Sequence, residues 1–229
     1  MSIIVDTPRV MVRTVAVGPM NNNVYLLTVK ETGGGILIDA ADEPDTIDRL
    51  IRQAAEETVR ENSVVGSDRQ ARTVELIITT HSHADHTSAL ADMVVRTGAR
   101  TAAGREDVAQ IESFTGVATD LVLDDSGSLG IPGLSLTVIG LRGHTPGSIA
   151  LAYCEEGCPV HLFSGDSLFP GGVGNTNQDP ARFASLYADV VSRLFDVYPD
   201  DTIVWPGHGN PTTLGTERPH LGEWKQRGW

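Results

Sequence analysis

The segment His81-Ser82-His83-Ala84-Asp85-His86 decides how this sequence is interpreted. It directly follows the apolar run 76–78, which is typical of a buried strand. Three imidazoles and one carboxylate this close together supply the nitrogen and oxygen donors that bind divalent metals. A surface loop does not need three histidines at fixed spacing, and a packed core would have to pair both nitrogens of each ring. The segment therefore predicts a metal site at the end of a strand.

Three further segments each place one metal-binding side chain after an apolar run and beside a glycine. They contain His144 (in 143–148, GHTPGS), Asp166 (in 164–169, SGDSLF) and His208 (in 206–209, PGHG). Glycine allows close approach of two backbone segments, which a crowded site requires. Each segment alone is common in caps and hydrogen-bonded loops. Together with the first segment they hold five of the 7 histidines, which predicts one shared site and leaves His161 and His220 with ordinary strand and surface roles.

The composition describes a loop-rich globular protein. The 229 residues are 40% apolar, with 24 Gly and 12 Pro, and we expect one domain over residues 1–229. The formal net charge of -13 argues against a nucleic-acid partner, because phosphate backbones need a basic surface. No run reaches membrane-spanning length, and residues 1–12 do not resemble a signal peptide. We therefore expect a cytoplasmic protein with a small-molecule substrate and no membrane partner.

Strand and helix patterns alternate from one end of the chain to the other. The apolar patterns predict strands at 10–17, 24–29, 36–38, 74–78, 100–103, 134–139, 149–153, 160–163 and 202–204. They predict helices from Pro44 to near Arg60, directly after the histidine segment as far as Gly98, at 105–114 and at 181–195, with a polar loop at 61–72. This mixture indicates a single layered α/β domain.

On these motifs the sequence resembles the metallo-β-lactamase fold superfamily. The pattern H-x-H-x-D-H followed by a single His, Asp and His covers residues 81–208. The resemblance implies a four-layer αβ/βα sandwich with a dinuclear metal centre at one edge of its two sheets. It implies that one metal is held by His81, His83 and His144, that the other is held by Asp85, His86 and His208, and that Asp166 bridges the two.

The implied ligand set leaves room at the metals for a substrate. Imidazoles and carboxylates suit zinc, with iron or manganese as alternatives. Two cations about 3.5 to 4 Å apart can lower the pKa of a shared water to about 7, which yields a hydroxide nucleophile at neutral pH. The same cations polarise a carbonyl group. Asp85 and Asp166 would take part in catalysis through the metals that they hold.

Within the superfamily, segments 143–148 and 164–169 are most similar to the glyoxalase II (hydroxyacylglutathione hydrolase) branch and its persulfide dioxygenase relatives. The implied reaction is hydrolysis of a thioester, in which the thiolate leaves without needing a proton. Two features differ from that branch. The classical enzymes continue with a helical domain that helps to bind glutathione, whereas here residues 209–229 follow the last predicted ligand, His208. Segment 169–176, FPGGVGNT, has Asn175 near the place where family members often have a cation. The acyl group and the carrier thiol, including whether it is glutathione, stay open.

Three alternative activities remain. An iron-dependent persulfide dioxygenase would use two histidines and one carboxylate, which suit Fe(II). A lactonase or another small-ester hydrolase could use the same hydroxide. A β-lactamase is disfavoured, because an amide nitrogen asks more of a proton donor and the sequence shows no periplasmic signal. The sequence does not indicate an oligomeric state.

Other residues have weaker claims. Cys154 and Cys158 flank a short polar segment, and we expect a reduced pair. Asp39 follows an apolar strand and could either orient a ligand histidine or cap the next turn. Residues 21–23, three consecutive asparagines, are predicted to form a turn.

Overall fold

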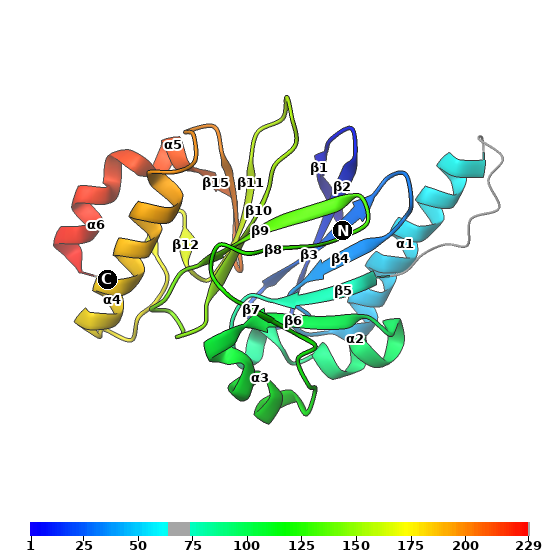
Figure 1. The fold of residues 1–229 in the computed structure, drawn as a ribbon, viewed down its shortest axis with the longest axis horizontal. Helices are drawn as coiled ribbons and strands as arrows, with labels where there is room; N and C mark the ends of the chain where they lie inside the picture. Colours follow the sequence, from blue (N-terminus) through cyan, green and yellow to red (C-terminus); the bar gives the residue numbers. More distant parts are fainter. Residues whose placement is uncertain (64–73, 229) are drawn as a thin grey trace.

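Two β-sheets face each other, and helices cover the outer side of each (Figure 1). The computed structural model describes residues 1–63 and 74–228. The first sheet is formed by β1 (Ser2–Asp6), β2 (Val10–Val17), β3 (Asn22–Val29), β4 (Gly35–Ile38), β5 (Val74–Thr79), β6 (Arg100–Gly104) and β7 (Leu121–Leu123), in that spatial order. Strands β1 to β4 form an antiparallel meander, and β4 to β7 are parallel.

The second sheet comes from the other half of the chain. Its spatial order is β15 (Thr212–Thr213), β14 (Ile203–Pro206), β11 (His161–Gly165), β10 (Ile149–Tyr153), β9 (Leu134–Gly140) and β8 (Ser128–Ile131). Strands β11 and β14 are parallel, and the other neighbours are antiparallel. A separate two-stranded ribbon, β12 (Leu168–Phe169) and β13 (Gly172–Val173), follows β11.

The helices divide between the two outer faces. The first sheet is covered by α1 (Pro44–Ser63), α2 (Leu90–Thr97) and α3 (Val108–Thr115), and the second by α4 (Pro180–Val190), α5 (Leu214–Glu217) and α6 (Leu221–Arg227). Figure 1 shows α1, α2 and α3 on one side of the molecule and α4 and α6 on the other. The predicted four-layer αβ/βα sandwich is therefore confirmed.

Alternation along the strands builds the layers. In β4, Ile36 and Ile38 belong to the core between the sheets, whereas Leu37 packs under the helices. In the second sheet, Val138 faces the central core and Ile139 faces α4. Successive strand residues point to opposite faces, so strands that are apolar on both faces must be covered on both.

The sequence predicted the long elements, and most of the elements that it missed are short. The predicted helix at 181–195 is α4 followed by a π-helical turn at 191–195, and a 3-10 turn at 105–107 begins the predicted helix at 105–114. The helix after the histidine segment does not follow at once: the segment itself ends in a 3-10 turn (Ala84–His86), and three turn residues, 87–89, precede α2. Helix α1 runs to Ser63, so the start of the loop predicted at 61–72 is helical, and its remainder lies outside the described residues.

The missed elements are β1, β7, β8, β12, β13, β15, α5 and α6. Most of them are only two to five residues long, too short to show a clear apolar period.

Across residues 1–63 and 74–228, no helix combines the length and the apolar character needed to cross a bilayer. Cys154 and Cys158 are both free thiols.

Candidate metal centre

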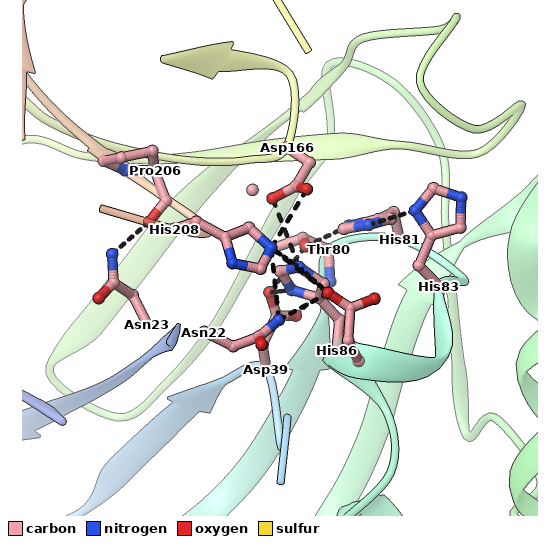
Figure 2. Close-up of polar contacts among 12 residues, drawn as sticks. Asn22, Asn23, Asp39, Thr80, His81, His83, His86, Asp166, Pro206 and His208 are labelled. Carbon is pink, nitrogen blue, oxygen red and sulfur yellow. Dashed lines mark hydrogen bonds and ion pairs between the residues drawn. The ribbon is translucent and has the colours of Figure 1, made fainter. Parts of the chain in front are cut away.

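The predicted metal-binding residues meet at one edge of the sandwich, because each lies in a loop that follows the carboxyl end of a strand. Figure 2 shows five of them together: His81, His83, His86, Asp166 and His208. The histidine segment follows β5, and His144, Asp166 and His208 follow β9, β11 and β14. Their ligand atoms form three groups within 4.8 Å: His81, His83 and His144; His81, His86 and Asp166; and Asp85, His86 and His208. The first and third groups are the two sets implied by the resemblance. That these residues bind metal stays a prediction.

The first group brings three ring nitrogens together. Nδ1 of His83 lies 3.1 Å from Nε2 of His81 and 2.9 Å from Nε2 of His144. Imidazoles about 2.0 to 2.1 Å from a shared zinc ion place their nitrogens at roughly this separation. All three rings converge on one point, so the group fits a metal ion.

Hydrogen bonds on the far side of the rings fix which nitrogen is free. Nδ1 of His144 lies 2.7 Å from the carbonyl oxygen of Asn175, and Nδ1 of His208 lies 3.0 Å from that of Met20. Carbonyl oxygens only accept, so each Nδ1 carries the hydrogen and each Nε2 turns a lone pair toward the centre. Backbone carbonyls thus prepare both rings as ligands.

The second group joins two histidines and a carboxylate. Nε2 of His208 lies 3.2 Å from Nε2 of His86 and 3.3 Å from Oδ2 of Asp85. Nδ2 of Asn22 donates to the same Oδ2 at 2.9 Å, which fixes the orientation of the carboxylate. This group also fits one divalent ion.

Asp166 lies between the two groups. Its Oδ2 is 3.6 Å from Nε2 of His144 and 3.4 Å from Nε2 of His208, and its Oδ1 is 3.4 Å from Nε2 of His86. That Oδ1 is buried and has no hydrogen-bond partner among the described residues. An unpaired buried carboxylate oxygen is costly unless a cation neutralises it. The orphaned oxygen and the converging lone pairs therefore fit divalent cations at the two groups, and Asp166 would help to hold them.

The histidines of the centre lie in two kinds of environment, which shift their pKa values in opposite directions. Burial lowers the pKa of both His81 and His144, which keeps them neutral, as ligands must be. Burial also acts against the charged form of His86, but the carboxylates of Asp39 and Asp166 outweigh it and raise its pKa to about 10. Although burial opposes ionisation of Asp166, the surrounding histidines hold its pKa well below its usual value. The carboxylates of Asp39 and Asp166 thus make the surroundings of His86 favourable for positive charge.

Sequence reasoning missed or misjudged several supporting residues. The turn predicted at 21–23 is confirmed only for Asn21, which ends a turn at 18–21 with a φ of 53°. Asn22 instead begins β3, is 1% exposed and contacts Asp85, and Nδ2 of Asn23 donates to the carbonyl oxygen of Pro206 at 3.0 Å. An asparagine run is equally typical of turns, so no local signal distinguished these roles. Of the two roles left open for Asp39, the structure supports the first, with Oδ2 2.8 Å from Nδ1 of His86.

Asp107 is a supporting residue that the sequence did not suggest. Its buried carboxylate accepts hydrogen bonds from the backbone nitrogens of Ser82 at 2.9 Å and Gly147 at 2.8 Å, and from Oγ1 of Thr145. One side chain thus joins the loop after β5 to the loop after β9. Nothing in the segment around Asp107 marks it, because its partners are distant in sequence.

A cavity of about 600 Å³ adjoins the first group. Its walls include His83 and His144, together with Gln110, Arg142, Gly143, Thr145, Pro146, Asn177, Ala181, Arg182 and Ser185. A substrate bound there would lie directly beside two of the three histidines of that group.

Comparisons with known proteins agree with this architecture. A hydroxyacylglutathione hydrolase from Polaromonas sp. is 31% identical over 186 residues, which are 80% of this chain and 60% of that protein. The chain thus matches less than two thirds of that relative's length. Among solved structures, the BLEG-1 B3 metallo-beta-lactamase has a TM-score of 0.71 at 26% identity, covering 93% of this chain and 99% of that one. TTHA1623 in a di-iron-bound form has a TM-score of 0.62 at 31% identity, covering 90% and 96%.

The sequence model of the metallo-beta-lactamase superfamily matches residues 17–208, a span that includes every residue of the two groups and Asp166. The chain belongs to the metallo-beta-lactamase superfamily.

Proposed function

We propose that this protein is a metal-dependent hydrolase of small thioesters that works with two divalent metal ions. The observation that carries the proposal is the place of Asp166 between two three-ligand groups, beside a cavity large enough for a small molecule. The name of the Polaromonas relative, hydroxyacylglutathione hydrolase, supports a thioester as the substrate.

Bound divalent ions would supply a water of lowered pKa and a Lewis acid for the thioester carbonyl. The chain's own residues would hold those ions and set their surroundings. His81 and His144 remain neutral because they are buried, and Asp85 and Asp166 supply the negative charge that balances the cations. Asn22 keeps one oxygen of Asp85 in a fixed direction through its amide.

The lining of the cavity bears on which leaving group the site can release. None of the residues that line it carries a carboxyl, thiol or phenol group that could protonate a leaving amine. A thiolate leaves as an anion and needs no such donor, whereas an amide nitrogen does. The lining therefore favours thioesters over amides.

We propose zinc as the native metal, with iron and manganese as alternatives. Imidazole-rich sets bind zinc well, and carboxylate-containing sets also accept iron. The di-iron-bound TTHA1623 supports iron as an alternative for this fold.

A second candidate activity is that of an iron-dependent persulfide dioxygenase. The group of His81, His86 and Asp166 supplies two imidazoles and one carboxylate within 4.8 Å. That combination is typical of non-haem Fe(II) oxygenases.

Elemental analysis of the purified protein, combined with a substrate panel, tests these proposals. The panel contains a small thioester, a lactone, a β-lactam and a persulfide, the last with oxygen uptake as the readout. We expect two metal ions per chain and thioester hydrolysis that is lost with a chelator and restored by metal. In Asp166→Ala, turnover should disappear and the metal content should fall. One iron per chain with oxygen uptake would favour the dioxygenase, and a preference for the lactone or the β-lactam would overturn the thioester proposal.

A further inference from the structure

The cavity beside the first histidine group has an unusual charge for this protein. The chain carries 30 acidic and 17 basic residues, yet the cavity lining contains two arginines and no aspartate or glutamate. An isolated arginine beside a metal site raises the local concentration of anions, because a low-dielectric wall focuses its field. The two arginines, Arg142 and Arg182, differ in whether a carboxylate pairs with them.

Arg142 is already neutralised. Its guanidinium pairs with Asp189 of α4, with Nη2 lying 2.9 Å from Oδ1. Asp189 also pairs with Arg193 at 3.2 Å, and Arg193 in turn pairs with Asp125. These four side chains form a row of two positive and two negative charges, which leaves no net charge for a ligand.

Arg182 is different. It lies in the first turn of α4, where Nε donates to the carbonyl oxygen of Gly143 at 2.8 Å and Nη2 donates to that of His144. Among the side chains that the structure describes, those of residues 1–57 and 74–228, no carboxylate forms an ion pair with Arg182. Its charge is therefore unbalanced at the wall of the cavity, next to a predicted metal ligand.

The remaining lining suits a polar ligand. Gln110, Asn177 and Ser185 surround the same cavity and offer neutral hydrogen-bonding groups. Asn177 has a positive φ of 55°, in a turn whose Asn175 carbonyl holds His144 and whose Asp179 caps α4. The turn that orients the histidine thus also places Arg182.

We propose that this cavity binds a carboxylate carried by the substrate and that Arg182 is the residue that selects it. The inference rests on the proposed thioesterase function and narrows it to anionic thioesters. A planar guanidinium binds a carboxylate through charge-assisted hydrogen bonds, which are stronger than those between neutral groups. The carboxylate belongs either to the acyl group or to the thiol, and the two positions call for separate tests.

Two matched pairs of thioesters distinguish these positions. In the first pair the acyl group ends in a carboxylate or in the corresponding primary amide, with ethanethiol as the common thiol. In the second pair acetyl is the common acyl group, and the thiol is 3-mercaptopropanoate or its amide. The preference is the ratio of kcat/KM for the acid to that for the amide, measured in wild type, Arg182→Gln and Arg182→Lys. Arg96→Gln, on α2 and paired with Asp45 at 2.7 Å, is the matched control.

We expect wild type to prefer the acid in one of the two pairs. Arg182→Gln should reduce that preference about 10- to 100-fold, the effect of losing one charge-assisted hydrogen bond. Arg182→Lys should retain part of it, and Arg96→Gln all of it. Arg182 also braces the loop of His144, and a purely bracing role would lower kcat/KM for acid and amide equally. That result, or equal rates for acid and amide in both pairs of wild type, would overturn the inference.

Binding separates this inference from the proposed function. Non-hydrolysable thioether analogues of the four compounds are titrated by calorimetry into the metal-loaded protein. Tighter binding of an acid analogue that depends on Arg182 supports the carboxylate site even if none of the thioesters is hydrolysed. Hydrolysis without any such binding preference would leave the hydrolase proposal standing and refute the carboxylate site.

Discussion

Oδ2 of Asp39 lies 2.8 Å from Nδ1 of His86, and the two side chains are 2% and 0% exposed. The same carboxylate accepts hydrogen bonds from the backbone nitrogen of Thr80 at 2.7 Å and from its hydroxyl at 2.8 Å. Asp39 follows β4 and Thr80 follows β5, so the carboxylate joins two neighbouring strands to one predicted metal ligand. Asp39 has a left-handed φ of 59°, a conformation that Asp and Asn tolerate better than most residues.

Asp39→Asn is expected to weaken metal binding at the group that contains His86. Asparagine has the same shape and also tolerates the left-handed conformation, but it removes the charge that fixes the ring. Loss of such an outer partner costs about 10- to 100-fold in metal affinity. A competition titration with a chromophoric chelator measures the change, and Asp45→Asn on α1 is the surface control. Unchanged affinity would show that Asp39 does not orient the ligand.

The predicted ligands were accessible from the sequence because each one follows an apolar run that forms a strand. That local pattern can be recognised in the sequence without any knowledge of how the strands are arranged. Asp107, Asn22 and Arg182 lack such a pattern, because their roles arise only when the two sheets meet. The bridge between Asn22 and His208, which are far apart in sequence, is an example.

The fold was recoverable for a related reason. Strands such as β2 and β10 are long enough to show their period, and the structure gives them the predicted bounds. The edge strands β7 and β15 have three and two residues, so tertiary pairing rather than local pattern determines them.

Asp107→Asn is expected to lower both the free energy of unfolding and the metal affinity of the first histidine group. The carboxylate of Asp107 now accepts hydrogen bonds from three donors. The side-chain amide nitrogen of the asparagine would face one of them and leave that buried donor without a partner. Such a loss costs about 1 to 3 kcal/mol. Urea unfolding of the protein after its metal has been removed with a chelator measures the stability. Titration with metal measures the affinity of the site. If stability falls while metal affinity does not, Asp107 supports the fold but does not position the histidines.

Asp189→Asn is expected to reduce stability at neutral pH but not in acid. Burial by itself raises the pKa of Asp189, but the hydrogen bonds from Arg142 outweigh it and hold that pKa below its usual value of about 3.8. A carboxyl group whose pKa is lower in the folded state than in the unfolded state stabilises the fold at any pH above the unfolded-state pKa. That contribution is lost as the pH falls through the pKa of the folded state. The difference in unfolding free energy between wild type and Asp189→Asn should therefore shrink as the pH falls below about 4. Urea unfolding at a series of pH values checks it, and a constant difference would show that the ion pair is not its source.

Gly207→Ala is expected to abolish metal binding at the shared site while the chain still folds. A Cβ at this position would lie 2.2 Å from Oδ1 of Asp166 and 2.7 Å from Cε1 of His86, closer than real Cβ contacts allow. Both side chains would have to move, and a metal site tolerates displacements of only about 0.5 Å. Gly222→Ala is the matched control, because Gly222 lies inside α6 with open space at its Cβ, and alanine there should raise stability by up to about 1 kcal/mol. Elemental analysis and thermal unfolding of the two variants measure both effects. If Gly207→Ala retained the metal content of wild type, the close approach of Gly207 to Asp166 would not be a requirement of the centre.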